Sequence, residues 1–156
     1  MLKGLDPVLT PDLLWLLAAM GHGDDIAVVD ANHPAERIAG ATATGRIIRL
    51  PGLTMARAIR AILSVLPLDD FEPAPVRCMQ VVGDPDATPD IQREVQLVLD
   101  AAAGRAQPMA GIERFGFYEA AKTSFGIVQV GDIRPYGCFL LRKGVITAPP
   151  DSEPQP

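Results

Sequence analysis

The sequence contains few cysteines, histidines and aromatic residues. Its 156 residues include two cysteines and two histidines, and 5% of the residues are aromatic. Cys78 and Cys138 are far apart, with neither the spacing of a zinc site nor the density of a disulfide scaffold. We therefore expect a reduced protein whose side chains form no transition-metal site.

Long hydrophobic runs and an excess of positive charge are also absent. The longest apolar run covers residues 13–20, which is too short to span a bilayer and lacks the flanks of a signal peptide. With 14 Lys and Arg against 19 Asp and Glu, the formal net charge is −5, which disfavours binding to nucleic acids. The composition thus predicts a cytoplasmic protein that binds neither membranes nor nucleic acids.

Common nucleotide-binding, hydrolase and metalloprotease motifs do not occur. The chain has no Gly-x-Gly-x-x-Gly, no P-loop, no Gly-x-Ser-x-Gly and no His-Glu-x-x-His. We expect no cofactor, and we expect any chemistry to come from acid/base side chains on short polar loops.

The sequence does contain enough apolar residues, 48%, for one domain with a real core. Apolar residues at helical spacing, with Thr10 as the first N-cap and Gly21 as a left-handed stop, predict helices over 11–20, 55–66, 91–102 and 117–124. Short apolar runs predict strands over 26–29, 46–50, 76–82, 125–130 and 138–142. Because helices and strands alternate, we expect an α/β fold, a single-domain layered sheet with covering helices over residues 1–146. The proline-rich segment 147–156 is predicted to be a disordered tail.

Candidate acid/base residues flank the first predicted strand. His22 lies between two glycines, whose backbone can approach a ligand closely. An unperturbed imidazole titrates at about pH 6.5 and can give and take protons; alternatively, His22 only caps the preceding helix. Asp30 closes the strand, where a carboxylate faces a ligand crevice in many α/β sheets or forms an Asx turn. His33, before Pro34, is expected to be an ordinary loop residue.

Two tyrosines in the last third of the chain are further candidates. Tyr118 lies near Arg114, and Tyr136 lies in the turn Arg134-Pro-Tyr-Gly137. A phenol offers a flat face and a hydrogen-bonding tip, which together with Arg and Asp side chains suits a neutral polyol such as a sugar. The alternative for either tyrosine is a boundary position with its hydroxyl in water.

Seven segments occur in a characteristic order along the chain: Met1-Leu-Lys-Gly4, Leu9-Thr-Pro-Asp-Leu-Leu14, Met20-Gly-His-Gly-Asp-Asp25, Asp30-Ala-Asn-His-Pro34, Glu113-Arg-Phe-Gly-Phe-Tyr-Glu119, Gly131-Asp-x-x-x-Tyr-Gly137 and Lys143-Gly-Val145. Together they resemble the fucose mutarotase and ribose pyranase family of sugar-anomer isomerases, and its fucose branch more than its ribose branch.

The resemblance implies an isomerase that interconverts the α and β anomers of L-fucose or a related monosaccharide by acid/base ring opening and closure. It implies that His22 is the main acid/base and that Tyr118 is a second proton-transfer or hydroxyl-orienting group. The sugar-binding residues that it implies are Asp30, Arg114, Tyr136, Gly137 and Cys138.

Two positions depart from the family pattern. The family has Asn where this chain has Cys138, and a thiol lacks the paired donor and acceptor of an amide. Fucose-type members can also carry a carboxylate where this chain has Arg57. The alternative function is therefore a sugar-binding or regulatory protein without turnover.

The spacing of His22 and Asp30 predicts a shared site. The two residues are eight positions apart with a strand between them. An extended path at roughly 3.3 Å per residue separates them by about 26 Å, which one sugar ring cannot bridge. Either the glycine loop folds back strongly, or the two residues serve pockets that neighbouring subunits complete. We expect the second, a homo-oligomer in which subunits share sites, and the ring-shaped decamers of the family would fit this expectation.

Overall fold

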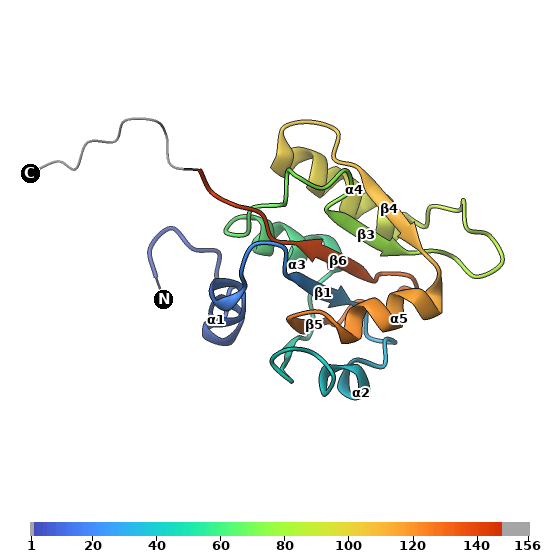
Figure 1. The fold of residues 1–156 in the computed structure, drawn as a ribbon, viewed down its shortest axis with the longest axis horizontal. Helices are drawn as coiled ribbons and strands as arrows, with labels where there is room; N and C mark the ends of the chain where they lie inside the picture. The colour runs from blue at the N-terminus through green and yellow to red at the C-terminus, as the bar shows by residue number, and fades with distance from the viewer. Residues whose placement is uncertain (1, 148–156) are drawn as a thin grey trace, which may run out of the picture.

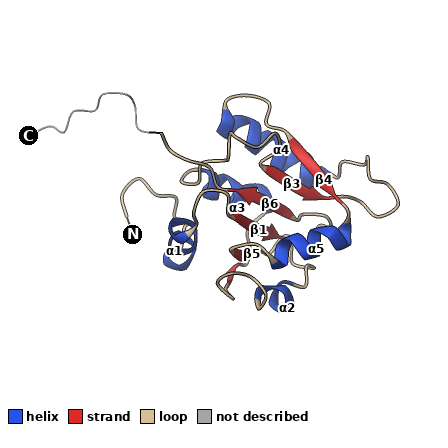
Figure 2. Cartoon of the chain, viewed as in Figure 1, coloured by secondary structure: helices blue, strands red, loops and turns tan. Residues whose placement is uncertain are grey.

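The computed structural model describes residues 2–147 and shows a six-stranded mixed sheet covered by helices (Figure 1). Its strands are β1 (Asp25–Val29), β2 (Ile47–Leu50), β3 (Val76–Met79), β4 (Met109–Ile112), β5 (Gly126–Val130) and β6 (Phe139–Arg142). Its helices are α1 (Pro11–Ala19), α2 (Ala35–Ala39), α3 (Met55–Leu63), α4 (Asp90–Ala103) and α5 (Arg114–Lys122). The strand order is β2-β5-β1-β6-β3-β4, in which β6 is antiparallel to both neighbours and the other pairs are parallel. The predicted α/β class is thus confirmed (Figure 2).

The sheet is buried on both faces because its strands are apolar at successive positions. In the central strand β1, Ile26 and Val28 pack in the core formed with α1, α3 and α4, whereas Ala27 and Val29 pack in the core formed with α2 and α5. Burying a Val or Ile side chain contributes roughly 1.5–3 kcal/mol. Both cores therefore hold β1 in place, and its two ends emerge at opposite edges of a rigid layer.

The first helix ends differently from the prediction. α1 ends at Ala19 and Met20 caps it in an extended conformation, so the left-handed stop predicted at Gly21 is wrong. The Lys143 ammonium instead donates to the carbonyls of Leu17 and Met20, at 2.8 and 2.6 Å. The Lys143 ammonium therefore donates hydrogen bonds to carbonyls at the end of the helix. In a left-handed glycine cap, backbone N–H groups would donate to such carbonyls.

The sequence pattern misses two short elements and misplaces several boundaries, among them the end of α3, which is Leu63 instead of residue 66. α2 has five residues and β4 is a partly exposed edge strand, so neither carries a strong apolar period. α5 begins at Arg114 instead of residue 117, because the Glu113 carboxylate accepts hydrogen bonds from Phe115 and Gly116 N–H. β3 ends at Met79 instead of residue 82, because the chain turns at 81–84. Beyond residue 147, the predicted tail lies outside the described residues.

The topology brings several strand ends to one edge of the sheet. β1 and β3 are both antiparallel to β6, and β4 is parallel to β3. The carboxyl ends of β1, β3 and β4 therefore lie at the same edge as the start of β6. Such an edge is where ligands bind in open α/β sheets, and the loop before β1 lies at the opposite edge.

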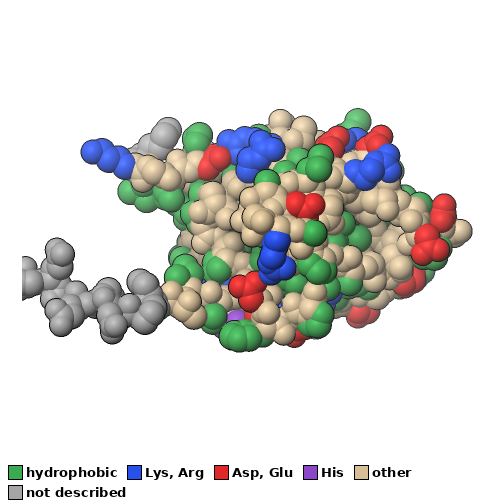
Figure 3. All heavy atoms as spheres, turned by 90° about the horizontal axis from the view of Figure 1, so that it is seen from above, with side chains coloured by type: hydrophobic (Ala, Val, Ile, Leu, Met, Phe, Trp, Pro, Cys, Tyr) green, Lys and Arg blue, Asp and Glu red, His purple; other side chains and the backbone are tan. Residues whose placement is uncertain are grey.

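The surface of the described residues carries mixed charge. Within residues 2–147, no helix is both long and apolar enough to cross a bilayer. On the face in Figure 3, basic and acidic side chains are scattered among hydrophobic ones. The described part of that face therefore lacks the continuous basic surface that nucleic-acid-binding proteins present.

Candidate functional site

A pocket of about 220 Å³ lies at the edge where β1 and β3 end and β6 begins. It is smaller than the pockets that hold drug-sized ligands, so it suits a small molecule. Its lining residues are Asp30, Asn32, His33, Met79, Arg114, Tyr118, Pro135, Tyr136 and Cys138. Five of the seven predicted site residues line this pocket. Gly137 is not a lining residue but contacts Asp30 through its N–H, and His22 lies elsewhere.

Asp30 closes β1 and is fixed by backbone donors from two loops. Its Oδ1 accepts from Asn32 N–H at 2.9 Å, and its Oδ2 accepts from Gly137 N–H at 3.0 Å. The residue is 3% exposed. Burial raises the pKa of the Asp30 carboxyl above its usual value, and the N–H donors partly oppose this shift. Asp30 is therefore both a turn-forming residue and a pocket carboxylate, the two alternatives that its sequence position allowed.

The first turns of α5 place a cation and a phenol in the pocket wall. The Glu113 cap starts the helix at Arg114, and Tyr118 follows one turn later on the same side. Arg114 lies over the ring of Phe115, 4.6 Å from its centroid, and its buried Nε has no hydrogen-bond partner among the described residues. The guanidinium therefore keeps donor capacity for a ligand.

The loop between β5 and β6 contributes Tyr136 in a strained conformation. Tyr136 has a φ of 64° and is the sole non-glycine residue with positive φ in the described chain. The Gln92 amide donates to its carbonyl at 3.1 Å, and Val82 N–H donates to its hydroxyl at 3.4 Å. At Gly137, a Cβ would lie 2.4 Å from Ile91 Cδ1, so a larger residue would require the Ile91 side chain to move; glycine lets this loop pack against α4 and donate its N–H to Asp30 without that change.

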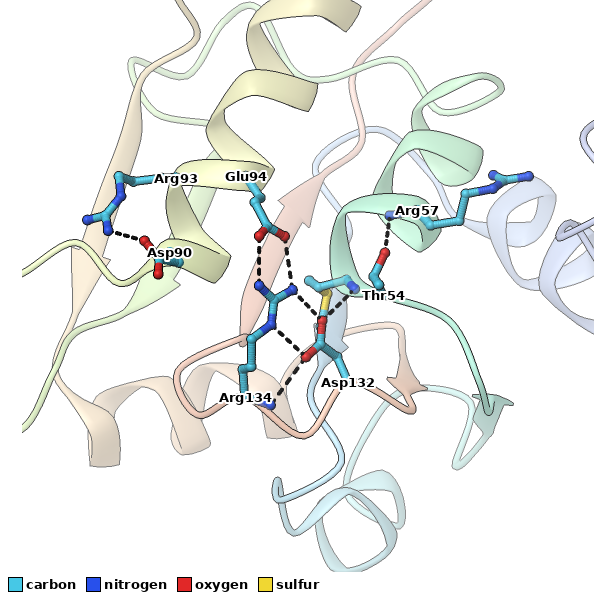
Figure 4. A network of polar contacts seen from close by, with 8 residues as sticks. Thr54, Arg57, Asp90, Arg93, Glu94, Asp132 and Arg134 are labelled. Carbon is cyan, nitrogen blue, oxygen red and sulfur yellow. Dashed lines mark hydrogen bonds and ion pairs between the residues drawn. The ribbon is translucent and has the colours of Figure 1, made fainter.

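Figure 4 shows how the same loop is anchored to two helices. The Arg134 guanidinium donates to both carboxylate oxygens of Glu94 on α4, at 2.7 and 2.9 Å, and to both oxygens of Asp132, at 3.0 and 2.8 Å. Asp132 also accepts from Met55 N–H at the start of α3, at 3.1 Å. This network fixes the loop that carries Tyr136.

The expectation that His33 is an ordinary loop residue is wrong. His33 is 6% exposed, lines the pocket and packs edge-to-face with Tyr118, at 5.3 Å between ring centroids. Burial lowers the pKa of His33 to about 4, so the imidazole is neutral at pH 7. Its Nδ1 lies 3.6 Å from the sulfur of Cys138. The sequence signal that could have identified His33 is its position three residues after Asp30, the aspartate at the end of β1. The Asx turn of Asp30 folds His33 back over the end of the strand.

His22 lies at the opposite edge of the sheet, before β1, and does not line the pocket. Its side chain is 46% exposed, and its Nε2 is 3.3 Å from Asp69 Oδ1. Phe71 packs edge-to-face against the ring at 5.5 Å. The alternative in which His22 only caps α1 is not observed, since Lys143 occupies that position.

Asp69 is a residue that the sequence analysis did not single out. It is 3% exposed and also accepts from Phe71 N–H at 3.1 Å. No local pattern could reveal it, because 47 positions separate it from His22.

Arg57, the other position that departs from the family pattern, does not line the pocket. It forms two hydrogen bonds with Asp6, at 2.8 and 2.7 Å, and so ties α3 to the N-terminal segment. Within one chain, its substitution therefore acts outside the pocket.

Comparison with known proteins gives relatives of nearly the same length. The human fucose mutarotase is 39% identical over 152 residues, covering 96% of this chain and 97% of that protein. The fucose mutarotase of Streptococcus pneumoniae, whose crystal structure contains L-fucose, is 31% identical and superposes with a TM-score of 0.84 over 94% of this chain and 100% of that one. A crystal structure of a protein provisionally named as sugar-binding is 49% identical, with a TM-score of 0.91 over 94% of this chain and 97% of that one.

The family comparison covers almost the whole described chain. Residues 3–146 match the model of the RbsD / FucU transport protein family. This span includes both edges of the sheet, and with them the pocket and the loop of His22. The chain therefore belongs to the RbsD / FucU family.

Proposed function

We propose that this protein is a mutarotase that interconverts the α and β anomers of L-fucose or a closely related monosaccharide. The observation that carries the proposal is the small pocket in which Asp30, Arg114, Tyr118 and Tyr136 converge. Full-length relatives named fucose mutarotase support the sugar and the reaction. The composition supports a cytoplasmic location.

Each pocket group has a role in holding a neutral polyol. Asp30 accepts a hydrogen bond from one sugar hydroxyl, and Arg114 donates to others. Tyr136 offers its ring as an apolar surface for the sugar, and the hydroxyl of Tyr118 orients or exchanges a proton. Gly137 acts through its N–H, which holds Asp30, and Cys138 forms the buried floor beside Asp30.

The reaction requires only two proton transfers. A base takes the proton of the anomeric hydroxyl while an acid protonates the ring oxygen, and the bond between C1 and the ring oxygen breaks. The open-chain aldehyde rotates, and the same transfers in reverse close the ring on the other face. Positioned acid/base groups accelerate such steps by about 10²–10⁴-fold. We assign the main transfer to His22, whose ring is oriented by Asp69.

We propose that His22 acts in the pocket of a neighbouring subunit. β1 separates His22 from the pocket by five strand residues, or roughly 17 Å. Both edges expose large apolar side chains that a subunit contact would bury. Phe71, beside His22, is 73% exposed; Val82, Phe115 and Ile133, on the segments around the pocket, are 59%, 61% and 78% exposed.

A contact between one edge and the opposite edge of the next copy is heterologous, and such contacts form rings when the rotation between copies closes. This favours a ring-shaped homo-oligomer, and the decamer that the family resemblance implies is our proposal for its size.

The test is NMR saturation transfer between the α and β anomeric protons, with L-fucose and D-ribose as the first sugars. The protein should accelerate exchange of its preferred sugar above the uncatalysed rate. His22→Ala should reduce the acceleration by at least about 10²-fold. The variant should stay folded, since within one chain the His22 side chain is half exposed.

A protein that shifts on sugar titration but leaves the exchange rate unchanged would support the alternative, a sugar-binding or regulatory protein. Exchange that persists in His22→Ala would rule out the assigned acid/base.

A further inference from the structure

Three buried side chains form a chain of polar contacts in the pocket wall. Asp30 Oδ2 lies 3.5 Å from the sulfur of Cys138, and this sulfur lies 3.6 Å from His33 Nδ1. Asp30, His33 and Cys138 are 3%, 6% and 2% exposed. Because solvent is largely excluded, these groups must satisfy one another's hydrogen-bonding needs.

One placement of the protons satisfies all the contacts. The ionised carboxylate of Asp30 only accepts hydrogen bonds, so the thiol proton belongs between Cys138 and Asp30. If the thiol donated to His33 instead, the sulfur and the carboxylate would face each other as two acceptors. The imidazole proton then belongs on Nδ1, where the sulfur accepts it. His33 Nε2 is buried without a partner among the described residues and stays unpaired in either tautomer, so the contact between Nδ1 and the sulfur decides: an unprotonated Nδ1 would face the sulfur as a second acceptor.

The protonation states required by this arrangement agree with the burial of the groups. Burial lowers the pKa of His33 to about 4 and raises the pKa of the Cys138 thiol well above its usual value. At neutral pH the imidazole is therefore uncharged and the thiol keeps its proton.

We propose that His33 is a positioning residue of the sugar pocket, whose Nδ1–H holds the Cys138 thiol proton on Asp30. A carboxylate offers about four lone-pair positions. Gly137 N–H and the thiol donate to Oδ2, so we expect the sugar hydroxyl at Oδ1, to which Asn32 N–H donates. The backbone N–H of His33 is a further donor near this carboxylate. The inference rests on the proposed sugar-binding function of Asp30. Thiol and imidazole together then supply the donor and acceptor that one amide would supply at position 138.

The proposal predicts that the two residues depend on each other. A thiol proton rotates freely about the Cβ–S bond, so it needs His33 to direct it. The N–H groups of an amide are fixed in the amide plane and need no such guide. Substitution of His33 should therefore reduce kcat/KM for sugar exchange in the natural chain, and should reduce it much less when Asn replaces Cys138.

The first test follows Asp30 itself by carboxyl ¹³C NMR titration of the sugar-free protein. His33→Phe keeps a flat ring but removes Nδ1–H, and Cys138→Ala removes the thiol. Each should raise the titration midpoint of Asp30, by roughly half a unit or more, because a donor to the carboxylate is weakened or lost. Cys78→Ala, at a buried cysteine outside the pocket, is the matched control and should leave the midpoint unchanged. The titratable groups that line the pocket with Asp30 are His33, Arg114, Tyr118, Tyr136 and Cys138.

The second test measures sugar exchange in a double-mutant cycle. His33→Phe should lower kcat/KM about tenfold, as expected for a misdirected hydrogen bond to a charged group. In the Cys138→Asn background, His33→Phe should lower it less than about threefold. Cys138→Ser, which keeps a rotatable donor, should retain most of the activity.

The outcomes separate this inference from the proposed function. An Asp30 midpoint that is the same in the natural protein and in His33→Phe, or an equal loss of kcat/KM in both backgrounds, overturns the positioning role. If the natural protein accelerates no sugar exchange, the proposed function fails, and the NMR midpoint still decides the proton arrangement. If His33→Phe does not fold, His33→Leu, which also removes Nδ1–H, takes its place in both tests, and an unchanged Asp30 midpoint in that variant overturns the positioning role.

Discussion

At the scale of single residues, the chemistry depends on how each titratable group is buried. Asp30 is enclosed and held by N–H donors, whereas His22 is half exposed and contacts a buried aspartate. Asp30 is therefore suited to bind a sugar hydroxyl at a fixed position. His22 is accessible to a sugar that is bound in the pocket of a neighbouring subunit.

His33 should make the stability of the fold depend on pH. The unfolded chain binds a proton at His33 near pH 6.5, but the folded chain binds it only near pH 4. The free energy of unfolding should therefore fall by about 3 kcal/mol as the pH falls from 6.5 to 4. Urea unfolding at fixed subunit concentration should show this slope in the natural protein and not in His33→Phe.

Equal slopes in the natural protein and in His33→Phe would contradict the burial argument.

Asp69 should affect turnover more than sugar binding. Asp69→Asn keeps the size of the side chain but removes the carboxylate that contacts His22 Nε2 at 3.3 Å. We expect kcat for anomer exchange to fall by roughly tenfold or more with little change in KM, because a neutral amide orients and stabilises a charged imidazole less well. A fall in kcat/KM caused by KM alone would argue that Asp69 only supports the loop.

At the scale of secondary-structure elements, the pocket is formed where loops are tied to helices. Glu113 caps α5 and so sets the register of Arg114 and Tyr118. Arg134 joins the β5–β6 loop to α4, and Asp132 joins it to α3 (Figure 4). The elements act as a frame that holds polar side chains at the sheet edge.

Asp132 should stabilise this frame at neutral pH. The neighbouring Arg134 guanidinium lowers the pKa of the Asp132 carboxyl to about 2, and the side chain is 5% exposed. Because the folded pKa is depressed, the stabilisation is complete above about pH 4 and is lost as the pH falls toward 2. Asp132→Asn should lower the free energy of unfolding by about 2 kcal/mol at pH 7.

The same substitution should have almost no effect near pH 2. Glu94→Gln, at the more exposed partner of the same arginine, should destabilise the protein less. A pH-independent effect of Asp132→Asn would point to packing instead of charge.

At the scale of the whole molecule, β1 separates the two halves of the proposed site. The pocket is at its carboxyl end and His22 precedes its amino end. A monosaccharide can contact both sets of residues only if two copies of the chain meet, so activity should depend on assembly.

Mixed oligomers can test this shared site directly. His22→Ala and Asp30→Asn should each be inactive alone, because each removes one half of every site. Refolding the two variants together in equal amounts should restore activity at about a quarter of the sites, where an intact His22 meets an intact Asp30. Sedimentation velocity should show a species near ten times the 16.6 kDa chain.

A mixture that stays inactive while forming mixed oligomers would show that both residues act on the sugar from the same chain.

Sequence by itself determined the class of the fold and most of the pocket residues. The apolar alternation of helices and strands is local. Asp30, Arg114, Tyr118 and Tyr136 are candidates by residue type, and the resemblance to the mutarotase family implies their place in the sugar site. The sequence pattern does not predict α2, β4 or the early start of α5. The reason is that neighbouring elements and capping residues decide where short and edge elements form.

Only the tertiary structure decided which polar groups meet. The contacts of His22 with Asp69 and of His33 with Cys138 join positions 47 and 105 residues apart, so no local pattern encodes them. The order of strands in the sheet placed His22 and Asp30 at opposite edges. The same tertiary packing buries the loop residue His33 in the pocket wall, where its imidazole is neutral. Such pairings follow from burying apolar surface over the whole chain, which is a non-local term of the free energy.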